Sequence, residues 1–115
     1  MVEKTIGSIQ RAADNLQYVS EQTHDVNVFV IGRGVLELNE ETFNDANPFI
    51  NGRAIETLDA GTICDRQGWD ELKNYLTTEL RELTAFKVGT TQREIYIVGL
   101  LDGYIVGVRS FAIET

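Results

Sequence analysis

The sequence has very little of three residues on which many folds and sites depend: one cysteine, one histidine and one proline among 115 residues. The single cysteine, Cys64, has no second thiol in the chain with which to form a disulfide. One cysteine and one histidine also cannot supply the four ligands of a structural zinc site. One proline with ten glycines gives no fibrous or disordered signature. These shortages exclude a disulfide scaffold and a zinc module.

Positive charge is also scarce, because eighteen acidic residues outnumber ten basic ones and leave a net charge of −8. Such a charge repels nucleic acid phosphates and anionic membranes over about 8–10 Å. Direct binding to DNA, RNA or a membrane is therefore disfavoured, and a protein partner with a basic groove is favoured. A charged surface that serves only solubility is the alternative.

Long apolar runs are missing as well. The longest, residues 95–101 and 104–108, are far shorter than the ~20 residues that span a bilayer. The first residues, Met1 to Lys4, are not followed by the apolar core of a signal peptide. We therefore expect a cytoplasmic protein without a membrane segment.

The length of 115 residues and the hydrophobic fraction of 43% suit a single core, so we expect one domain over residues 1–115. Apolar residues three and four positions apart predict two amphipathic helices, over residues 5–19 and 68–84. Between them, residues 44–48 predict a loop. The apolar positions are Ile6, Ile9, Ala13 and Leu16 in the first helix, and Trp69, Leu72, Leu76, Leu80 and Leu83 in the second.

Segments rich in β-branched residues predict strands. The clearest covers residues 25–31, and a shorter one covers residues 54–58. Two further strands, from 93 to 100 and from 104 to 113, flank Asp102-Gly103, a pair typical of a tight hairpin turn. Two helices together with such a hairpin predict an α+β domain with a largely antiparallel sheet.

No catalytic constellation is evident in the sequence. His24 lies in a polar turn without a matching nucleophile, and the acidic surroundings of Cys64 disfavour a reactive thiolate. Gly32-Arg33-Gly34 fits neither the Walker pattern nor a dinucleotide fingerprint. We therefore expect a protein that is not an enzyme and needs no cofactor. An enzyme that uses His24, Cys64 or acidic residues from distant parts of the chain stays as an alternative.

Five segments occur in this order along the chain: RAADNLQYVSEQ, VNVFV, QGWDEL, REIYIVG and GVRSFAIET. Together they resemble the nuclease A inhibitor-like family, over residues 6–115 with a poor match from 35 to 53. Members of this family inhibit a magnesium-dependent nuclease that cleaves DNA and RNA without regard to the sugar. The resemblance implies an α/β/α sandwich related to the pathogenesis-related-1 type, with two main helices and a mainly antiparallel sheet.

The resemblance also implies which residues bind the nuclease. Glu21, in the pair Ser20-Glu21, is expected to pair with a basic residue of the active-site groove. The closing pair, Glu114 and Thr115, is also expected to bind the nuclease. Thr115 is expected to reach the catalytic magnesium, an ion that prefers oxygen ligands such as a terminal carboxylate. The chain itself would hold no metal outside the complex. On this interpretation the chain stops at Thr115 so that its carboxylate can take the place of a substrate phosphate.

Trp69 is the fourth contact that the resemblance implies, as an anchor of the interface. Here Gly68 precedes Trp69, whereas the family has an acidic residue at that position. Two interpretations of Trp69 stay open, an interface anchor or a core residue at the start of a helix. The glycine also supports an alternative function, an interaction module of the same fold that has lost nuclease inhibition and binds another protein.

Overall fold

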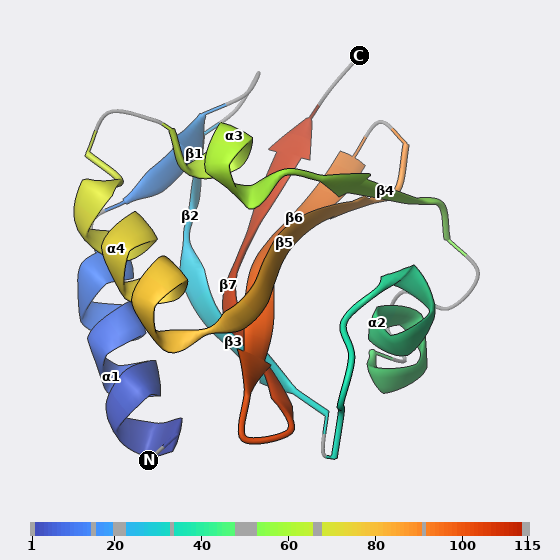
Figure 1. Ribbon diagram of the computed structural model, residues 1–115. Coiled ribbons are helices and arrows are strands. Elements are labelled where there is room, and N and C mark those ends of the chain that lie inside the picture. Colours follow the sequence, from blue (N-terminus) through green and yellow to red (C-terminus); the bar gives the residue numbers. More distant parts are fainter. Residues whose placement is uncertain are drawn as a thin grey trace.

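A five-stranded antiparallel sheet, with strand order β3-β7-β6-β5-β4, forms the centre of the protein in the computed structural model (Figure 1). Its strands are β3 (Asn27–Ile31), β4 (Ile55–Leu58), β5 (Arg81–Val88), β6 (Gln92–Leu101) and β7 (Tyr104–Ile113). A short hairpin of β1 (Gln17–Val19) and β2 (Thr23–Asp25) contacts β7. The structure describes residues 2–14, 16–19, 23–32, 34–47, 53–65, 68–90 and 92–113.

Helices pack on both faces of this sheet. They are α1 (Val2–Ala13), α2 (Glu40–Ala46), α3 (Ala60–Cys64) and α4 (Asp70–Glu79). Figure 1 shows α1, α3 and α4 on one side and α2 on the other. No helix in the described part of the chain has the length and apolarity that crossing a membrane would take. The predicted α+β class with an antiparallel sheet is therefore confirmed.

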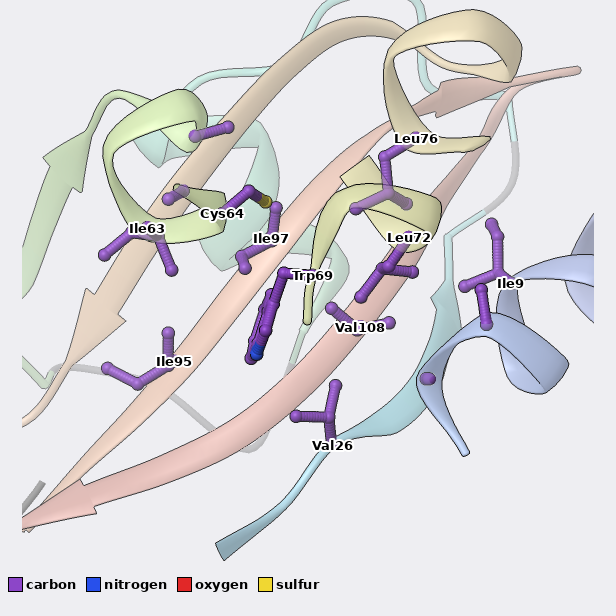
Figure 2. Close-up of a cluster of buried hydrophobic side chains, with 14 of the residues drawn as sticks. Ile9, Val26, Ile63, Cys64, Trp69, Leu72, Leu76, Ile95, Ile97 and Val108 are labelled. Carbon is purple, nitrogen blue, oxygen red and sulfur yellow. The ribbon is translucent and has the colours of Figure 1, made fainter. Parts of the chain in front are cut away.

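The larger apolar cluster lies between the sheet and the three helices α1, α3 and α4 (Figure 2). Ile9 from α1 and Leu72 and Leu76 from α4 are fully buried there. Ile97 and Val108 supply the sheet side of the same cluster. Burial of such side chains stabilises the fold by about 1.5–3 kcal/mol each, and it explains the apolar spacing of the two predicted helices.

A second cluster, rich in aromatic rings, lies under α2. The ring of Phe43 stacks on that of Phe86, with centroids 4.5 Å apart. Tyr96 meets the edge of Phe43 at 4.9 Å and packs against Phe29 at the same centroid distance. Because Tyr96 and Phe86 lie on the central strands β6 and β5, this cluster fixes α2 on the sheet.

The first helix ends earlier than its apolar spacing predicts, and the expected range of 5–19 is wrong at its end. The helix stops at Ala13, and residues 17–19 form strand β1. Tyr18 and Val19 belong to residue types that favour strands, and β1 pairs with β2 as an antiparallel hairpin. Backbone pairing with β2 therefore overrides the continued helical spacing to Leu16.

The second helix was likewise predicted too long, over residues 68–84. Leu80 has an extended backbone, and β5 begins at Arg81, so Leu83 lies in a strand. A spacing of three residues between Leu80 and Leu83 fits a helix, yet the strand between them is irregular, since its register shifts between Arg81 and Thr84. That bulge places both leucines against the same core cluster.

Residues 44–48 were predicted as a loop, but α2 extends to Ala46. The helix begins at a capping box, in which the amide of Thr42 donates to Asn39 Oδ1 at 2.9 Å. The amide of Asn39 in turn donates to the Thr42 hydroxyl at 3.0 Å. These caps and the buried ring of Phe43 stabilise a helix in a segment of low helix propensity.

The hairpin predicted at Asp102-Gly103 is confirmed. Both residues have positive φ, 52° and 82°, as a type I′ turn requires, and Leu101 pairs with Tyr104 across it. The predicted strand over 54–58 is confirmed as β4. The turn sets the register of the two longest strands, β6 and β7, which carry the site described next.

Candidate functional site

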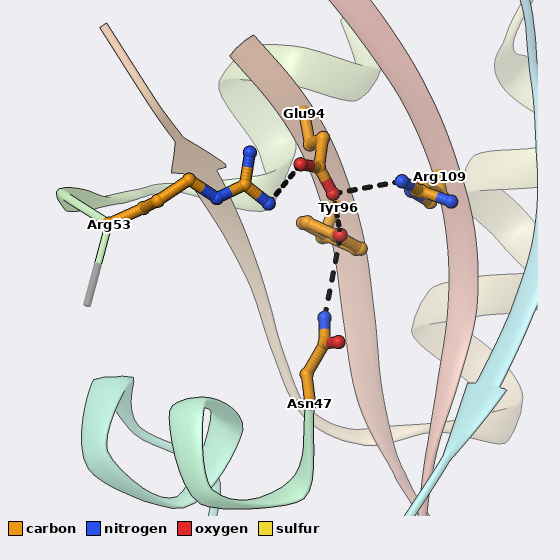
Figure 3. A network of polar contacts seen from close by, with 5 residues as sticks. All are labelled: Asn47, Arg53, Glu94, Tyr96 and Arg109. Atoms are coloured by element: carbon orange, nitrogen blue, oxygen red, sulfur yellow. Dashed lines mark hydrogen bonds and ion pairs between the residues drawn. The ribbon is translucent and has the colours of Figure 1, made fainter. Parts of the chain in front are cut away.

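A buried carboxylate, that of Glu94 on β6, lies at the centre of a polar network near the end of β7 (Figure 3). Arg109 of β7 donates from Nη2 to Glu94 Oε1 at 2.9 Å. The Tyr96 hydroxyl donates to the same oxygen, and Arg53 forms an ion pair with the other, Oε2. Asn47, at the end of α2, donates to the Tyr96 hydroxyl at 3.4 Å. We call these five residues the Glu94 network.

The register of the hairpin explains why these side chains meet. Tyr96 lies opposite Arg109 and Glu94 opposite Phe111. Since side chains alternate between the faces of a strand, all four project from the face that α2 covers. The network thus joins β6, β7, the end of α2 and the residues before β4.

Hydrogen-bond donors stabilise the charged form of Glu94 although the carboxylate is buried. The residue is only 7% exposed, and a buried carboxylate is costly unless it is paired and hydrogen-bonded. Burial raises the pKa of Glu94, but hydrogen bonds from Tyr96 and the two guanidiniums outweigh it and leave the pKa below its ordinary value. Burial and the bond to Glu94 raise the pKa of Tyr96 to about 12. The network therefore stays charged and bonded at neutral pH.

Ring contacts extend the network to the last described residues of β7. The Arg109 guanidinium lies 4.8 Å from the ring centre of Phe111 and 5.7 Å from that of Tyr96. Phe111, 39% exposed, in turn packs at 5.9 Å against the ring of His24 on β2. The Ser110 hydroxyl donates to the carbonyl of Asp25 at 2.7 Å, which ties β2 to β7 a second time.

A cavity of about 300 Å³ opens beside these rings. Its lining residues come from β2, β6, β7 and the segment before β4: His24, Arg53, Gln92, Arg93, Glu94, Phe111 and Ala112. Arg93 donates to Glu56 at 2.9 Å, so the charges at the rim are paired across strands. Within the described ranges, no group of three or more histidine, cysteine, aspartate or glutamate residues is arranged to hold a metal ion. The ion pairs of Arg93 with Glu56 and of Arg109 with Glu94 connect β6 to β4 and β7.

The predicted contacts Glu21, Glu114 and Thr115 lie outside the described residues, as does Ser20. The structure does describe the residues next to them along the chain. Strand β2 begins at Thr23, and β7 ends at Ile113. Because β2 and β7 contact one another, the two predicted segments adjoin neighbouring strands.

The structure places Trp69 in the core. Its side chain is 3% exposed and lies in the larger apolar cluster with Cys64 and Leu72 (Figure 2). This position agrees with the second interpretation of Trp69, a core residue at the start of a helix. A contact between Trp69 and a nuclease stays a prediction. Cys64 is also buried, whereas His24 lines the cavity, so the two candidate catalytic residues are not brought together.

The Glu94 network was not predicted from the sequence. Glu94 and Tyr96 lie two positions apart in the predicted strand 93–100, and the alternation of side chains assigns them to one face. The Asp102-Gly103 turn also gives the register that sets Arg109 opposite Tyr96. The contributions of Arg53 and Asn47 depend on the path of distant segments, and no local pattern carries that information.

Comparison with known proteins identifies the family. No curated protein matches the chain. A family model described as nuclease A inhibitor-like protein matches residues 57–115. This range contains β5, β6 and β7, and with them Glu94, Tyr96 and Arg109. The match covers more than half of the 115 residues of the chain, and the chain therefore belongs to the nuclease A inhibitor-like family.

Proposed function

We propose that the protein inhibits a magnesium-dependent nuclease that cleaves DNA and RNA without regard to the sugar, by blocking the active site with Thr115 and Glu21. Membership of the nuclease A inhibitor-like family carries this proposal. A nuclease is accordingly the partner, and the protein acts as an inhibitor rather than as an enzyme. Glu21 precedes β2 and Thr115 follows β7 in the sequence. The contact between these two strands therefore supports a mechanism in which both residues bind the same nuclease.

In the proposed mechanism, oxygen atoms replace those of the substrate. Thr115 would offer an oxygen ligand to the magnesium ion of the nuclease, where a phosphate of the nucleic acid would otherwise bind. Glu21 forms a charge-assisted pair with a basic residue of the groove. Glu114 adds a further negative charge beside Thr115. The inhibitor needs no cofactor of its own.

Charge and architecture support the same proposal. A net charge of −8 attracts a basic groove and repels nucleic acid. Helices lie on both faces of an antiparallel sheet, which supports the α/β/α sandwich of the pathogenesis-related-1 type (Figure 1). We place the inhibitor in the cytoplasm, where its chain of 115 residues would act as one domain.

A nuclease assay tests the proposal. Purified wild type, a Thr115 deletion and Glu21→Gln are titrated against a panel of magnesium-dependent non-specific nucleases, with plasmid DNA and RNA as substrates. We expect inhibition by wild type, its loss on deletion of Thr115, and a clear weakening by Glu21→Gln. Glu3→Gln is the matched control, because α1 begins at the end of the molecule opposite to the end of β7 (Figure 1). Full nuclease activity throughout the panel at micromolar wild type would contradict the proposal.

Trp69→Phe adds an arm to this assay that decides the role of Trp69. A side chain that is 3% exposed has almost no surface for a partner, so we expect the folded variant to keep its inhibition. A loss of inhibition as large as that of Glu21→Gln would instead support Trp69 as an interface anchor.

One observation favours the alternative of an interaction module that no longer inhibits a nuclease. Gly68, which stands where the family has an acidic residue, has a φ of +88°, a conformation that favours glycine. An acidic side chain at this point would therefore be strained. If the alternative holds, the Thr115 deletion changes no nuclease activity, and affinity capture recovers a defined partner that is not a nuclease.

A further inference from the structure

The Glu94 network leads by direct contacts to the two strand ends that adjoin the proposed inhibitory residues. Glu94 binds Arg109, the guanidinium of Arg109 lies over Phe111, and Phe111 packs against His24. His24 is the second residue of β2, and Phe111 lies two residues before the end of β7. One buried carboxylate is therefore connected to both ends.

We propose that Glu94 is a positioning residue for nuclease inhibition, which fixes the start of β2 relative to the end of β7 through Arg109, Phe111 and His24. This inference rests on the proposed function. It assigns Glu94 no contact with the nuclease, because its carboxylate is buried and already accepts bonds from three side chains.

The reach of the chain explains why strand placement matters. Glu21 precedes Thr23 by two residues, and Thr115 follows Ile113 by two. Two extended residues span at most about 7 Å. A shift of the start of β2 or of the end of β7 therefore moves the point in the chain to which Glu21 or Thr115 is tethered.

A single substitution, Glu94→Gln, removes the carboxylate charge that binds Arg109 and alters no other side chain of this connection. Arg109 is 37% exposed in its side chain, and its Nε has no hydrogen-bond partner among the described residues. The bond to Glu94 therefore holds the guanidinium between the rings of Tyr96 and Phe111. Without the carboxylate charge, Arg109 can turn into solvent, and Phe111 loses the cation that covers one face of its ring.

The first test compares Glu94→Gln with a core variant that also lowers stability but lies outside the Glu94 network. Ile9→Val removes one methylene from the α1 side of the core and leaves the network intact. We expect Glu94→Gln to weaken inhibition by about tenfold or more, and Ile9→Val to leave it unchanged, under conditions where both are fully folded. Equal weakening by the two variants would show a general loss of stability and would overturn the inference.

A double-mutant cycle separates positioning from an independent contribution. In a Glu21→Gln background only the Thr115 end engages the nuclease, so its placement relative to residue 21 no longer matters. We expect Glu94→Gln to cost clearly less inhibition there than in wild type. Losses that simply multiply would overturn the inference. If Glu94→Gln does not fold, Tyr96→Phe replaces it, since this change keeps the ring and removes one of the three donors.

Amide hydrogen exchange on the uncomplexed protein keeps the inference distinct from the proposed function. We expect Glu94→Gln to speed exchange at residues 23–25 and 110–113 more than elsewhere, and Ile9→Val to lack this local pattern. Unchanged exchange in both segments would overturn the inference even if the wild type inhibits a nuclease. Conversely, a wild type that inhibits no nuclease refutes the proposed function, whatever the exchange pattern.

Discussion

At the scale of single residues, Glu94 makes a prediction about acid stability. Its pKa in the folded protein lies below the ordinary value of 4.5, because donors from three side chains outweigh burial. Glu94 therefore stabilises the fold at any pH above the value in the unfolded chain, and this contribution is lost as the pH falls through the lower, folded value. At neutral pH, we expect Glu94→Gln to reduce the free energy of unfolding by about 1–3 kcal/mol.

Urea denaturation of wild type and Glu94→Gln at pH 7 and pH 3 measures the effect. The difference between the two proteins should be smaller at pH 3, because this pH lies below the ordinary pKa of 4.5, so Glu94 is mostly protonated in the unfolded chain and its charge stabilises the fold less. Glutamine does not titrate, so the change in the variant's stability between the two pH values comes from the other acidic groups. Subtracting it from the wild-type change leaves the contribution of Glu94. A difference that is the same at both pH values would show that the charge of Glu94 does not stabilise the fold.

At the scale of elements, the hairpin of β6 and β7 has a glycine where no side chain fits. A Cβ on Gly107 would lie 1.9 Å from the carbonyl oxygen of Ile97, so the backbone of β6 would have to move. We expect Gly107→Ala to reduce the free energy of unfolding by about 1–3 kcal/mol or more. The matched control is Gly7→Ala in α1, because a Cβ there meets nothing within 4 Å.

The control should change stability in the opposite direction. Alanine is a better helix former than glycine by roughly 0.5–1 kcal/mol, so Gly7→Ala should stabilise the protein. Thermal unfolding of both variants beside wild type gives the two signs. A neutral Gly107→Ala would mean that β6 and β7 approach less closely than the structure describes.

The same hairpin shows how much of the fold local sequence could predict. A turn at Asp102-Gly103 depends on the conformational preference of two adjacent residues, and it was predicted correctly. The ends of α1 and α4 were not, because apolar residues at Leu16, Leu80 and Leu83 keep a helical spacing beyond each helix. Pairing of β1 with β2 and of β5 with β6 decides those boundaries. Each pairing depends on the strand that follows in the chain, which the apolar spacing of the helix itself does not report.

At the scale of the whole molecule, the candidate site combines both halves of the chain. The family match begins at residue 57, and the C-terminal half supplies Glu94, Arg109 and the strand that leads to Thr115. The N-terminal half supplies β2, whose His24 packs on Phe111. Sequence resemblance could therefore suggest Glu21 and Thr115 as a pair, but the contact of β2 with β7 that relates them is a property of the tertiary fold.

The net charge of −8 also makes a prediction at this scale, about the rate of binding. If an acidic inhibitor enters a basic groove, long-range attraction speeds their association and salt screens it. Raising NaCl from about 0.1 M to about 1 M shortens the Debye length from about 10 Å to about 3 Å.

We therefore expect the association rate constant with the nuclease to fall by about tenfold or more over this range, with a smaller change in dissociation. Stopped-flow fluorescence measures both rates. Glu3→Gln combined with Glu79→Gln is the control, because it removes two negative charges, on helices α1 and α4, away from the end of β7 (Figure 1). This variant should associate only slightly more slowly than wild type, whereas Glu21→Gln should also dissociate faster. Association that is indifferent to salt would contradict electrostatic attraction between the acidic chain and a basic groove.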